Sequence, residues 1–217
     1  MTSLRALVAA AVALPLFGSL GGTPTPLPTE ISGQTDKSEW EYSFSTSVYV
    51  VRNEREYVNP TFTADREWLH VEGRYNYEAI NTGSVWLGWN FSAGEKLVLE
   101  VTPMVGGVFG NLTGIAPGYS LSLTYKQVEF FTQGEYFFDA ANREENFFYT
   151  WSELSLVPVQ WFRLGVVIDR TKALGSSIDI RRGPLVGFKY KDVDLTTYWL
   201  SPGSSDATFV FAVTVNF

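Results

Sequence analysis

Charged and apolar side chains alternate along the segment from Trp68 to Glu78. Because successive side chains of an extended strand point to opposite sides, one face of this segment carries His70, Glu72, Arg74 and Glu78. His70 is the only histidine in the chain. Beside Glu72 it could orient a water molecule or bind a metal ion weakly, or it could be held by hydrogen bonds without a chemical role. We favour the last interpretation, and we expect no metal site and no cofactor.

Other strand-like segments carry charges in the same alternating phase. The acidic set is Glu41, Glu72, Glu78, Glu100, Glu129, Glu135, Asp169, Asp179 and Asp194, and the basic set is Arg74, Arg163, Arg181 and Lys189. If water filled the space between these side chains, the excess of acid would attract cations. If the charges instead pair with one another, they form a structural network that blocks the space. The sequence leaves both interpretations open.

These side chains must be positioned by strands, since no segment has a sustained helical period. Turn signals separate segments at 40–51, 56–64, 68–80, 84–92, 96–107, 117–126, 128–139, 146–156, 160–171, 178–190, 193–201 and 206–217. This pattern predicts about twelve antiparallel strands. Pro60 interrupts the segment 56–64 and makes it the least regular of the set. If that segment is a loop and one other strand is redrawn, the count becomes about ten.

The chain ends with a strand of strict alternation, Ala207 to Phe217. One of its faces is entirely apolar and consists of Phe209, Phe211, Val213, Val215 and Phe217. A last strand with an aromatic carboxy-terminus resembles the closing strand of bacterial outer-membrane β-barrels. The resemblance implies an all-β fold, a transmembrane antiparallel up-and-down β-barrel over residues 39–217. It also implies that this apolar face meets lipid and acts as the membrane-insertion signal for the barrel assembly machinery.

The start of the chain agrees with this location. Arg5 precedes an apolar run and small residues, which is typical of a cleaved secretory signal peptide over residues 1–22. Residues 23–38 contain prolines and small polar residues, which predicts a disordered periplasmic leader. We therefore expect the mature protein in the cell outer membrane, with outer-membrane lipid as its surroundings. The net charge of −7 argues against nucleic acid as a partner.

Connections alternate between short and longer ones. With the carboxy-terminus in the periplasm, the predicted periplasmic turns are 65–67, 92–95, 126–127, 158–159 and 191–192. The predicted outer connections are 52–55, 80–83, 108–118, 140–145, 172–177 and 202–205, and they are mostly longer, as is typical of outer-membrane barrels. The glycine-rich connection 108–118 could fold inward as a constriction, or its neighbouring glycines could allow a close backbone approach.

An aromatic cluster surrounds the predicted turn at 158–159. Tyr149, Trp151, Trp161 and Phe162 suit a girdle at the periplasmic membrane interface, and we favour that interpretation. The alternative is a sugar-binding track inside the barrel. It requires Tyr149, Trp151 and Trp161 all to point inward.

The sequence favours a passive, narrow channel for small polar solutes or ions, with a mild preference for cations. The alternative is a closed barrel whose lumen is plugged by salt bridges. Such a barrel would have a structural, anchoring or adhesion role in the membrane and would transport nothing. We expect no enzyme, and a barrel enzyme that acts on lipid is the least favoured alternative. Outer-membrane lipases place a serine two residues from the histidine, but Trp68 and Glu72 stand at that spacing here, and the Asp-x-His pair of omptin-like proteases is absent. The lumen residues are the two charged sets given above, together with His70.

Overall fold

The computed structural model describes residues 39–52 and 55–217. The predicted signal peptide, 1–22, and leader, 23–38, lie outside the described residues. The described chain forms thirteen strand segments and one short 3₁₀ helix. The strands are β1 (Glu41–Val51), β2 (Tyr57–Arg66), β3 (Leu69–Tyr75), β4 (Thr82–Trp89), β5 (Phe91–Ala93), β6 (Leu97–Gly110), β7 (Gly114–Tyr125), β8 (Val128–Asp139), β9 (Phe147–Val159), β10 (Phe162–Ala173), β11 (Asp179–Tyr190), β12 (Val193–Leu200) and β13 (Thr208–Asn216), and the helix η1 is Arg143–Glu145.

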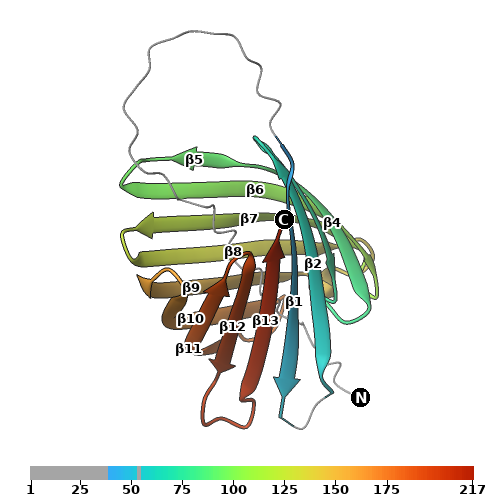
Figure 1. Cartoon of the computed structure of the whole chain (residues 1–217). Helices are drawn as coiled ribbons and strands as arrows, with labels where there is room; N and C mark the ends of the chain where they lie inside the picture. Colours follow the sequence, from blue (N-terminus) through green and yellow to red (C-terminus); the bar gives the residue numbers. More distant parts are fainter. Residues whose placement is uncertain (1–38, 53–54) are drawn as a thin grey trace, which may run out of the picture.

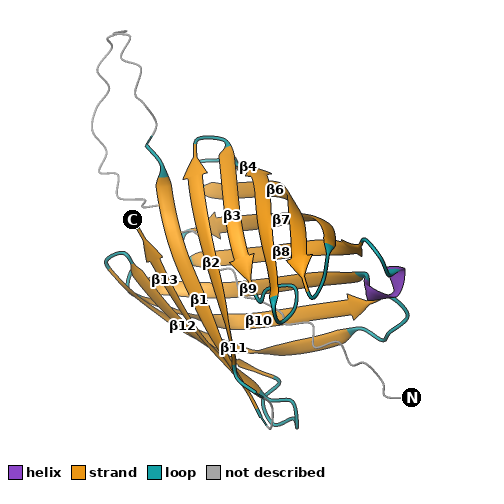
Figure 2. Cartoon of the chain, turned by 90° about the vertical axis from the view of Figure 1, so that its right-hand side faces the viewer, coloured by secondary structure: helices purple, strands orange, loops and turns teal. Residues whose placement is uncertain are grey.

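The strands close into a barrel of neighbouring antiparallel pairs. β1 pairs with β13, and β4 pairs with both β3 and β6, so the sheet closes on itself. β5 continues β4 beyond Asn90 and pairs with the same strand, β6. β4 and β5 are therefore one interrupted strand, and the barrel has the twelve strands predicted. Figures 1 and 2 show the two walls of this barrel, with β1 to β4 on one side of the interior and β7 to β10 crossing on the other.

The segment around Pro60 is a strand, as the count of twelve required. Pro60 lies opposite Thr46 of β1. On its other side the pairing of β2 with β3 ends at Thr61 and Arg74, so Pro60 stands beyond the last β3 partner. A proline, which lacks a backbone N–H, is tolerated where a strand has one paired side.

Connection lengths distinguish the two ends of the barrel. At the end that carries Phe217 the turns are 67–68, 94–96, 126–127, 160–161 and 191–192. At the opposite end they are 52–56, 76–81, 111–113, 140–146, 174–178 and 201–207. Short turns mark the periplasmic side of outer-membrane barrels and longer loops the outer side. We therefore call the end with Phe217 the periplasmic end and the other the outer end.

Two predicted connections are wrong. The glycine-rich segment 108–118 is no long loop, because β6 continues to Gly110 and β7 begins at Gly114. Gly110 turns the chain with a φ of 121°, in the left-handed region that favours glycine. The predicted turn 158–159 belongs to β9, and the chain turns at 160–161. Proline ends a strand in many sequences, but here Pro158 lies in the last residues of one.

The surface of the barrel that faces away from its interior, which we call the outer wall, is mostly apolar. The carboxy-terminal face is exposed as predicted, with Phe209 at 40%, Phe211 at 46% and Phe217 at 67%. Phe217 stacks on Tyr42, and its backbone exchanges hydrogen bonds with the same residue, which joins the carboxy-terminus to the first strand, β1. No helix among the described residues is long and apolar enough to span a membrane.

Candidate functional site

A cavity of about 1050 Å³ occupies the periplasmic half of the barrel interior. Hydroxyl groups from both walls line it, among them Ser43, Thr63, Thr102 and Ser122. Its carboxylates are Glu39, Glu41, Asp65, Glu67, Glu72, Glu100 and Asp192. Its basic residues are His70, which faces inward, and Arg66, which lies at its mouth and faces outward from β2 by strand phase. The cavity, which we call the vestibule, is therefore polar and strongly acidic.

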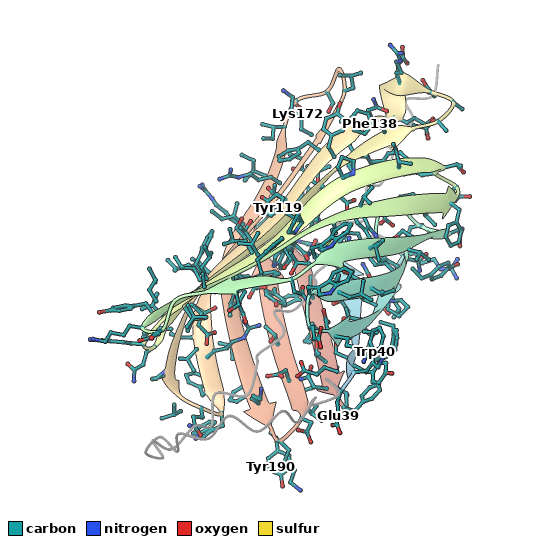
Figure 3. All side chains as sticks on the ribbon, turned by 90° about the horizontal axis from the view of Figure 1, so that it is seen from above. Glu39, Trp40, Tyr119, Phe138, Lys172 and Tyr190 are labelled. Atoms are coloured by element: carbon teal, nitrogen blue, oxygen red, sulfur yellow. The ribbon has the colours of Figure 1, made fainter. Side chains whose placement is uncertain are left out.

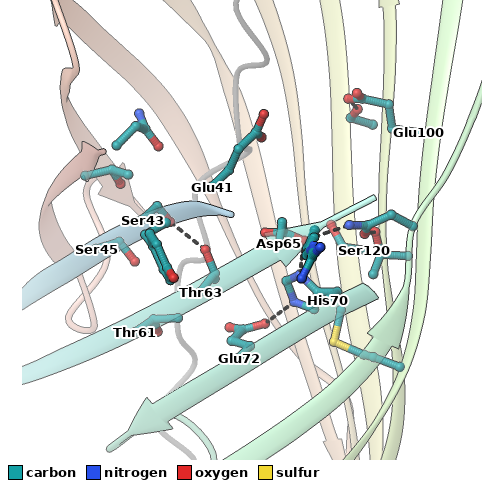
Figure 4. Close-up of a pocket in the computed structure, with 18 of the residues that line it drawn as sticks. Glu41, Ser43, Ser45, Thr61, Thr63, Asp65, His70, Glu72, Glu100 and Ser120 are labelled. Atoms are coloured by element: carbon teal, nitrogen blue, oxygen red, sulfur yellow. Dashed lines mark hydrogen bonds and ion pairs between the residues drawn. The ribbon is translucent and has the colours of Figure 1, made fainter. Parts of the chain in front are cut away.

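Strand register explains why these side chains meet. Glu41 pairs with Asp65, which pairs with His70, so the three stand in one row across β1, β2 and β3. The next row consists of Ser43, Thr63 and Glu72. On the facing wall Glu100 lies between Ser92 and Ser122, and Ser122 donates a hydrogen bond of 2.8 Å to it. Figure 4 shows Glu100 across the vestibule from Glu41 and Asp65.

His70 is held between two carboxylates. Its Nδ1 lies 2.8 Å from Oδ1 of Asp65, and its Nε2 lies 3.3 Å from Oε2 of Glu72. The Asn90 side chain donates to the same Asp65 oxygen, and Thr102 donates to Asn90, so the network crosses to β6. This arrangement fixes the ring and suits a structural histidine. The described residues contain no group of three or more acidic, histidine or cysteine ligands that could hold a metal ion.

Arg74 lies beside the vestibule and binds one of its lining residues, Glu72. Its guanidinium donates to both oxygens of Glu72, at 2.6 and 3.0 Å, and to Glu135 at 3.1 Å. The charge also lies over the rings of Tyr77 and Trp86, at 4.0 and 4.3 Å from their centroids. Such contacts are strong in a dry environment. Arg74 thus joins the acidic vestibule on one side to an aromatic layer on the other.

The outer half of the interior is filled. The largest side chains with almost no exposure all point inward from strands around the barrel: Tyr49, Trp86, Phe137, Tyr149, Trp151, Leu185, Tyr198 and Leu200. Trp151 meets Tyr198 edge to face at 5.1 Å, and Tyr49 stacks on Tyr57 at 4.5 Å. We call this region the packed layer. It has the close packing of a protein core, where dispersion and apolar burial stabilise the fold.

Ion pairs run through the packed layer. Glu153 accepts hydrogen bonds from Arg163, Tyr198 and Trp151, at 3.0, 2.8 and 2.8 Å. Arg181 pairs with Asp169 on the neighbouring strand. Glu153 is almost fully buried, so its charge depends on these donors.

The remaining residues of the predicted lumen sets lie at the two ends. Lys189 and Asp194 are 3.7 Å apart near the periplasmic end, and Glu129 is partly buried there. Asp179 is exposed at the outer end, where β11 begins. Glu78 is fully buried in the loop 76–81, where Ser84 donates to it at 2.6 Å. Burial raises the pKa of the Glu78 carboxyl above its usual range.

The predicted aromatic girdle is wrong for two of its members. Tyr149 and Trp151 are 2% and 0% exposed and belong to the packed layer. Trp161 is 59% exposed at a periplasmic turn, where it stacks on Phe188. The sugar-binding track is also wrong, since it required Trp161 to point inward. A buried tryptophan needs a partner for its N–H, and Glu153 supplies one for Trp151.

Sequence reasoning missed three residues that shape the site. Asp65 was assigned to a turn, yet it is the partner of His70. Asn90 interrupts the strand between β4 and β5 and binds Asp65. Trp86 fills the space beside Gly106 and Gly118, where an added Cβ would lie 2.5 and 3.0 Å from its ring. The sequence signal for Trp86 was its position two residues after Ser84, which puts both side chains on the inward face of the strand.

No protein-family model and no curated protein sequence matches the chain. Solved structures do resemble it. The KdgM porin superposes with a TM-score of 0.56 at 9% sequence identity, covering 81% of this chain and 99% of the porin. The KdgM porin in complex with disordered oligogalacturonate gives 0.54 at 9% identity, over 81% of this chain and 98% of that one. The Acinetobacter baumannii outer membrane protein Omp33 gives 0.50 at 10% identity, over 82% and 98%. The chain has the fold of the outer-membrane β-barrel porins.

Proposed function

We propose that the protein is a porin-type outer-membrane channel for small polar solutes or ions, closed at its outer half in the state described above. The observation that carries this proposal is the vestibule of about 1050 Å³, which is lined by residues of the periplasmic end and reaches inward to Glu72, the partner of Arg74. A polar cavity that opens at one end of a barrel would form the periplasmic part of a transmembrane pore. Its polar lining gives a hydrated solute hydrogen-bond partners that an apolar core lacks.

A preference for cations is the second part of the proposal. Glu41, Glu67 and Glu100 line the vestibule and form none of the ion pairs found among the described residues. Clefts lined by one sign of charge concentrate the opposite ion. The oligogalacturonate named for the KdgM complex is an acidic sugar, and this vestibule would repel it. We therefore propose neutral or cationic solutes for this chain.

We propose that the protein is not an enzyme. The two ring nitrogens of His70 are engaged by Asp65 and Glu72 inside the barrel. An enzyme that acts on membrane lipid needs its reactive group at the wall that faces the bilayer. We also propose that the carboxy-terminal strand is the segment that the barrel assembly machinery recognises.

Single-channel recording in a planar bilayer tests the proposal. The refolded wild-type protein is compared with a variant that carries Tyr77→Ala and Trp86→Ala, which removes the rings beside Arg74. A variant with Trp89→Ala is the matched control, because Trp89 is 44% exposed on the outer wall. We expect brief openings of the wild-type and control proteins, and longer openings of the double variant, all with a cation-selective reversal potential in a salt gradient.

Charge substitutions then test the preference for cations. Glu41→Gln with Glu100→Gln removes two carboxylates of the vestibule, and we expect the reversal potential to move toward that of a non-selective pore. Glu72 is unsuitable for this test, because its loss would leave Arg74 without its main partner. Unchanged selectivity in the Glu41→Gln, Glu100→Gln variant contradicts the assignment of the lining.

A permanently closed barrel is the second candidate, and the packed layer favours it. Eight large inward side chains of the packed layer are at most 2% exposed, so they occupy the outer half of the interior. In that case neither the wild-type protein nor the Tyr77→Ala, Trp86→Ala variant conducts, although both migrate as folded barrels. That result would replace the channel proposal with a structural or anchoring role.

A further inference from the structure

The charges that face outward from the described strands are few and unevenly placed. Strand alternation puts four charged residues on the outer wall: Arg66, Arg170, Lys172 and Arg182. All four are basic, and every carboxylate of the strands has the inward phase. Arg66 lies at the periplasmic end of β2, whereas the other three lie together at the outer end of β10 and β11.

Strand register brings Arg170, Lys172 and Arg182 into one patch. Arg170 pairs with Ile180 and Arg182 pairs with Ile168, so the two arginines are diagonal neighbours across β10 and β11. Diagonal neighbours are about 7–8 Å apart. Lys172 follows Arg170 on the same face of β10, one step nearer the outer end, opposite Phe148. Figure 3 shows Lys172 at the end of the barrel opposite to Glu39 and Tyr190.

The patch has no acidic counterpart within the described part of the chain. All three side chains are exposed, and none of them takes part in an ion pair there. Arg181 lies between them and faces inward, where it is paired with Asp169. The Asp169 carboxylate is therefore already neutralised by another cation. Three like charges on one small surface repel one another, and an anion from outside the chain would relieve that repulsion.

Apolar and aromatic side chains show how deep the patch lies. Ile180, 48% exposed, and Phe148, 40% exposed, are the strand partners of Arg170 and Lys172, so basic and apolar side chains mix at this level, as they do where a membrane protein passes from acyl chains to headgroups. Trp199 of β12 is 41% exposed and stacks on Phe209 at 5.5 Å, and aromatic pairs of this kind mark the membrane interface. Arg182 is opposite Ser201, just beyond Trp199 toward the outer end. The patch therefore lies at the level of the headgroups of the outer leaflet.

We propose that Arg170, Lys172 and Arg182 form a binding site for a phosphate-bearing glycolipid of the outer leaflet. Guanidinium groups bind phosphate oxygens in pairs, and a lysine adds a point charge. The acyl chains of the lipid would lie along the exposed apolar positions of β9, β10 and β11. The site lies on the outer wall, so it is independent of whether the barrel conducts.

Binding of purified lipid A to the detergent-refolded full chain tests the site, read by native mass spectrometry across a lipid titration. The test variant carries Arg170→Gln, Lys172→Gln and Arg182→Gln. The matched control carries Arg66→Gln, Lys96→Gln and Lys126→Gln, the same charge change at the periplasmic end. Because each basic residue near a membrane surface contributes about a fivefold factor, we expect the test variant to bind on the order of 100-fold more weakly, and the control to bind like the wild type.

Dephosphorylated lipid A separates phosphate recognition from apolar contact. We expect the wild-type protein to bind it no better than the test variant binds lipid A. Equal binding of lipid A by the test variant and the wild type overturns the site, and so does equal binding of both lipids by the wild type. If the test variant does not fold, the salt dependence of the wild type replaces it. Binding that does not weaken as salt is added then overturns the proposal, because exposed charges are screened.

Discussion

The two halves of the barrel interior have the same strand alternation and opposite contents. In the periplasmic half the inward positions hold serine, threonine and carboxylates, and they leave a cavity of about 1050 Å³. In the outer half the same positions hold Tyr49, Trp86, Trp151 and Tyr198, which are buried against one another. The number of strands sets the width of a barrel, but the size of its inward side chains decides whether that width is filled.

Arg74 lies where the two halves meet, and its removal should have the largest effect. Arg74→Ala leaves Glu72 and Glu135 buried without their main cation, so we expect a loss of about 3–5 kcal/mol in the free energy of unfolding. Urea unfolding of the protein in lipid vesicles measures it. Arg66→Ala, at the exposed periplasmic end, is the control and should cost less than about 1 kcal/mol. Equal costs for the two variants would mean that the boundary between the halves is not held by Arg74.

A pair of adjacent glycines sharpens the comparison. An added Cβ at Gly106 would lie 2.5 Å from the Trp86 ring, whereas at Gly107 it would meet nothing within 4 Å. Gly106→Ala should therefore destabilise the packed layer by about 1–3 kcal/mol. Gly107→Ala should leave stability unchanged or slightly raised. Both are measured by the same unfolding titration. A Gly107→Ala loss as large as that of Gly106→Ala contradicts close packing around Trp86.

Substitution of Glu78 should have the smallest effect on the free energy of unfolding, and that effect should depend on pH. Its carboxyl is buried and its pKa is raised, so the folded state holds the proton more tightly than the unfolded chain. Stability then falls as pH rises above the ordinary carboxyl range. Glu78→Gln removes this loss, and we expect the variant to be more stable than the wild type by about 1 kcal/mol at pH 8 and to lose that advantage toward pH 5.

Glu144, an exposed carboxylate, provides the control for Glu78. Glu144→Gln changes the same charge in the exposed outer connection and should leave the pH dependence of unfolding unaltered. A Glu78→Gln variant that is less stable than the wild type at pH 8 would show that the buried carboxylate is ionised and well satisfied in the folded protein.

The sequence predicted the barrel because alternation and the apolar terminal strand are local signals. Phase alone put Phe209 and Phe211 outside and Glu72 and Arg74 inside, and their exposures agree. Phase could not distinguish an inward aromatic from an interface aromatic, so Trp151 was misassigned. The partners of a lumen charge come from strands far away in sequence, such as Glu135 for Arg74. No spacing rule predicts such a contact, nor the point at which the vestibule ends.

Thiol accessibility tests the division of the interior most directly, since the chain has no cysteine of its own. Ser92→Cys and Ser122→Cys introduce a thiol into the vestibule, and Ala116→Cys and Ala212→Cys introduce one into the packed layer. A small charged thiol reagent is added to the folded protein in lipid vesicles, and labelling is followed by mass spectrometry. We expect rapid labelling at positions 92 and 122, and labelling at 116 and 212 only after unfolding. Equal labelling at all four positions would contradict the packed layer and indicate a lumen open from end to end.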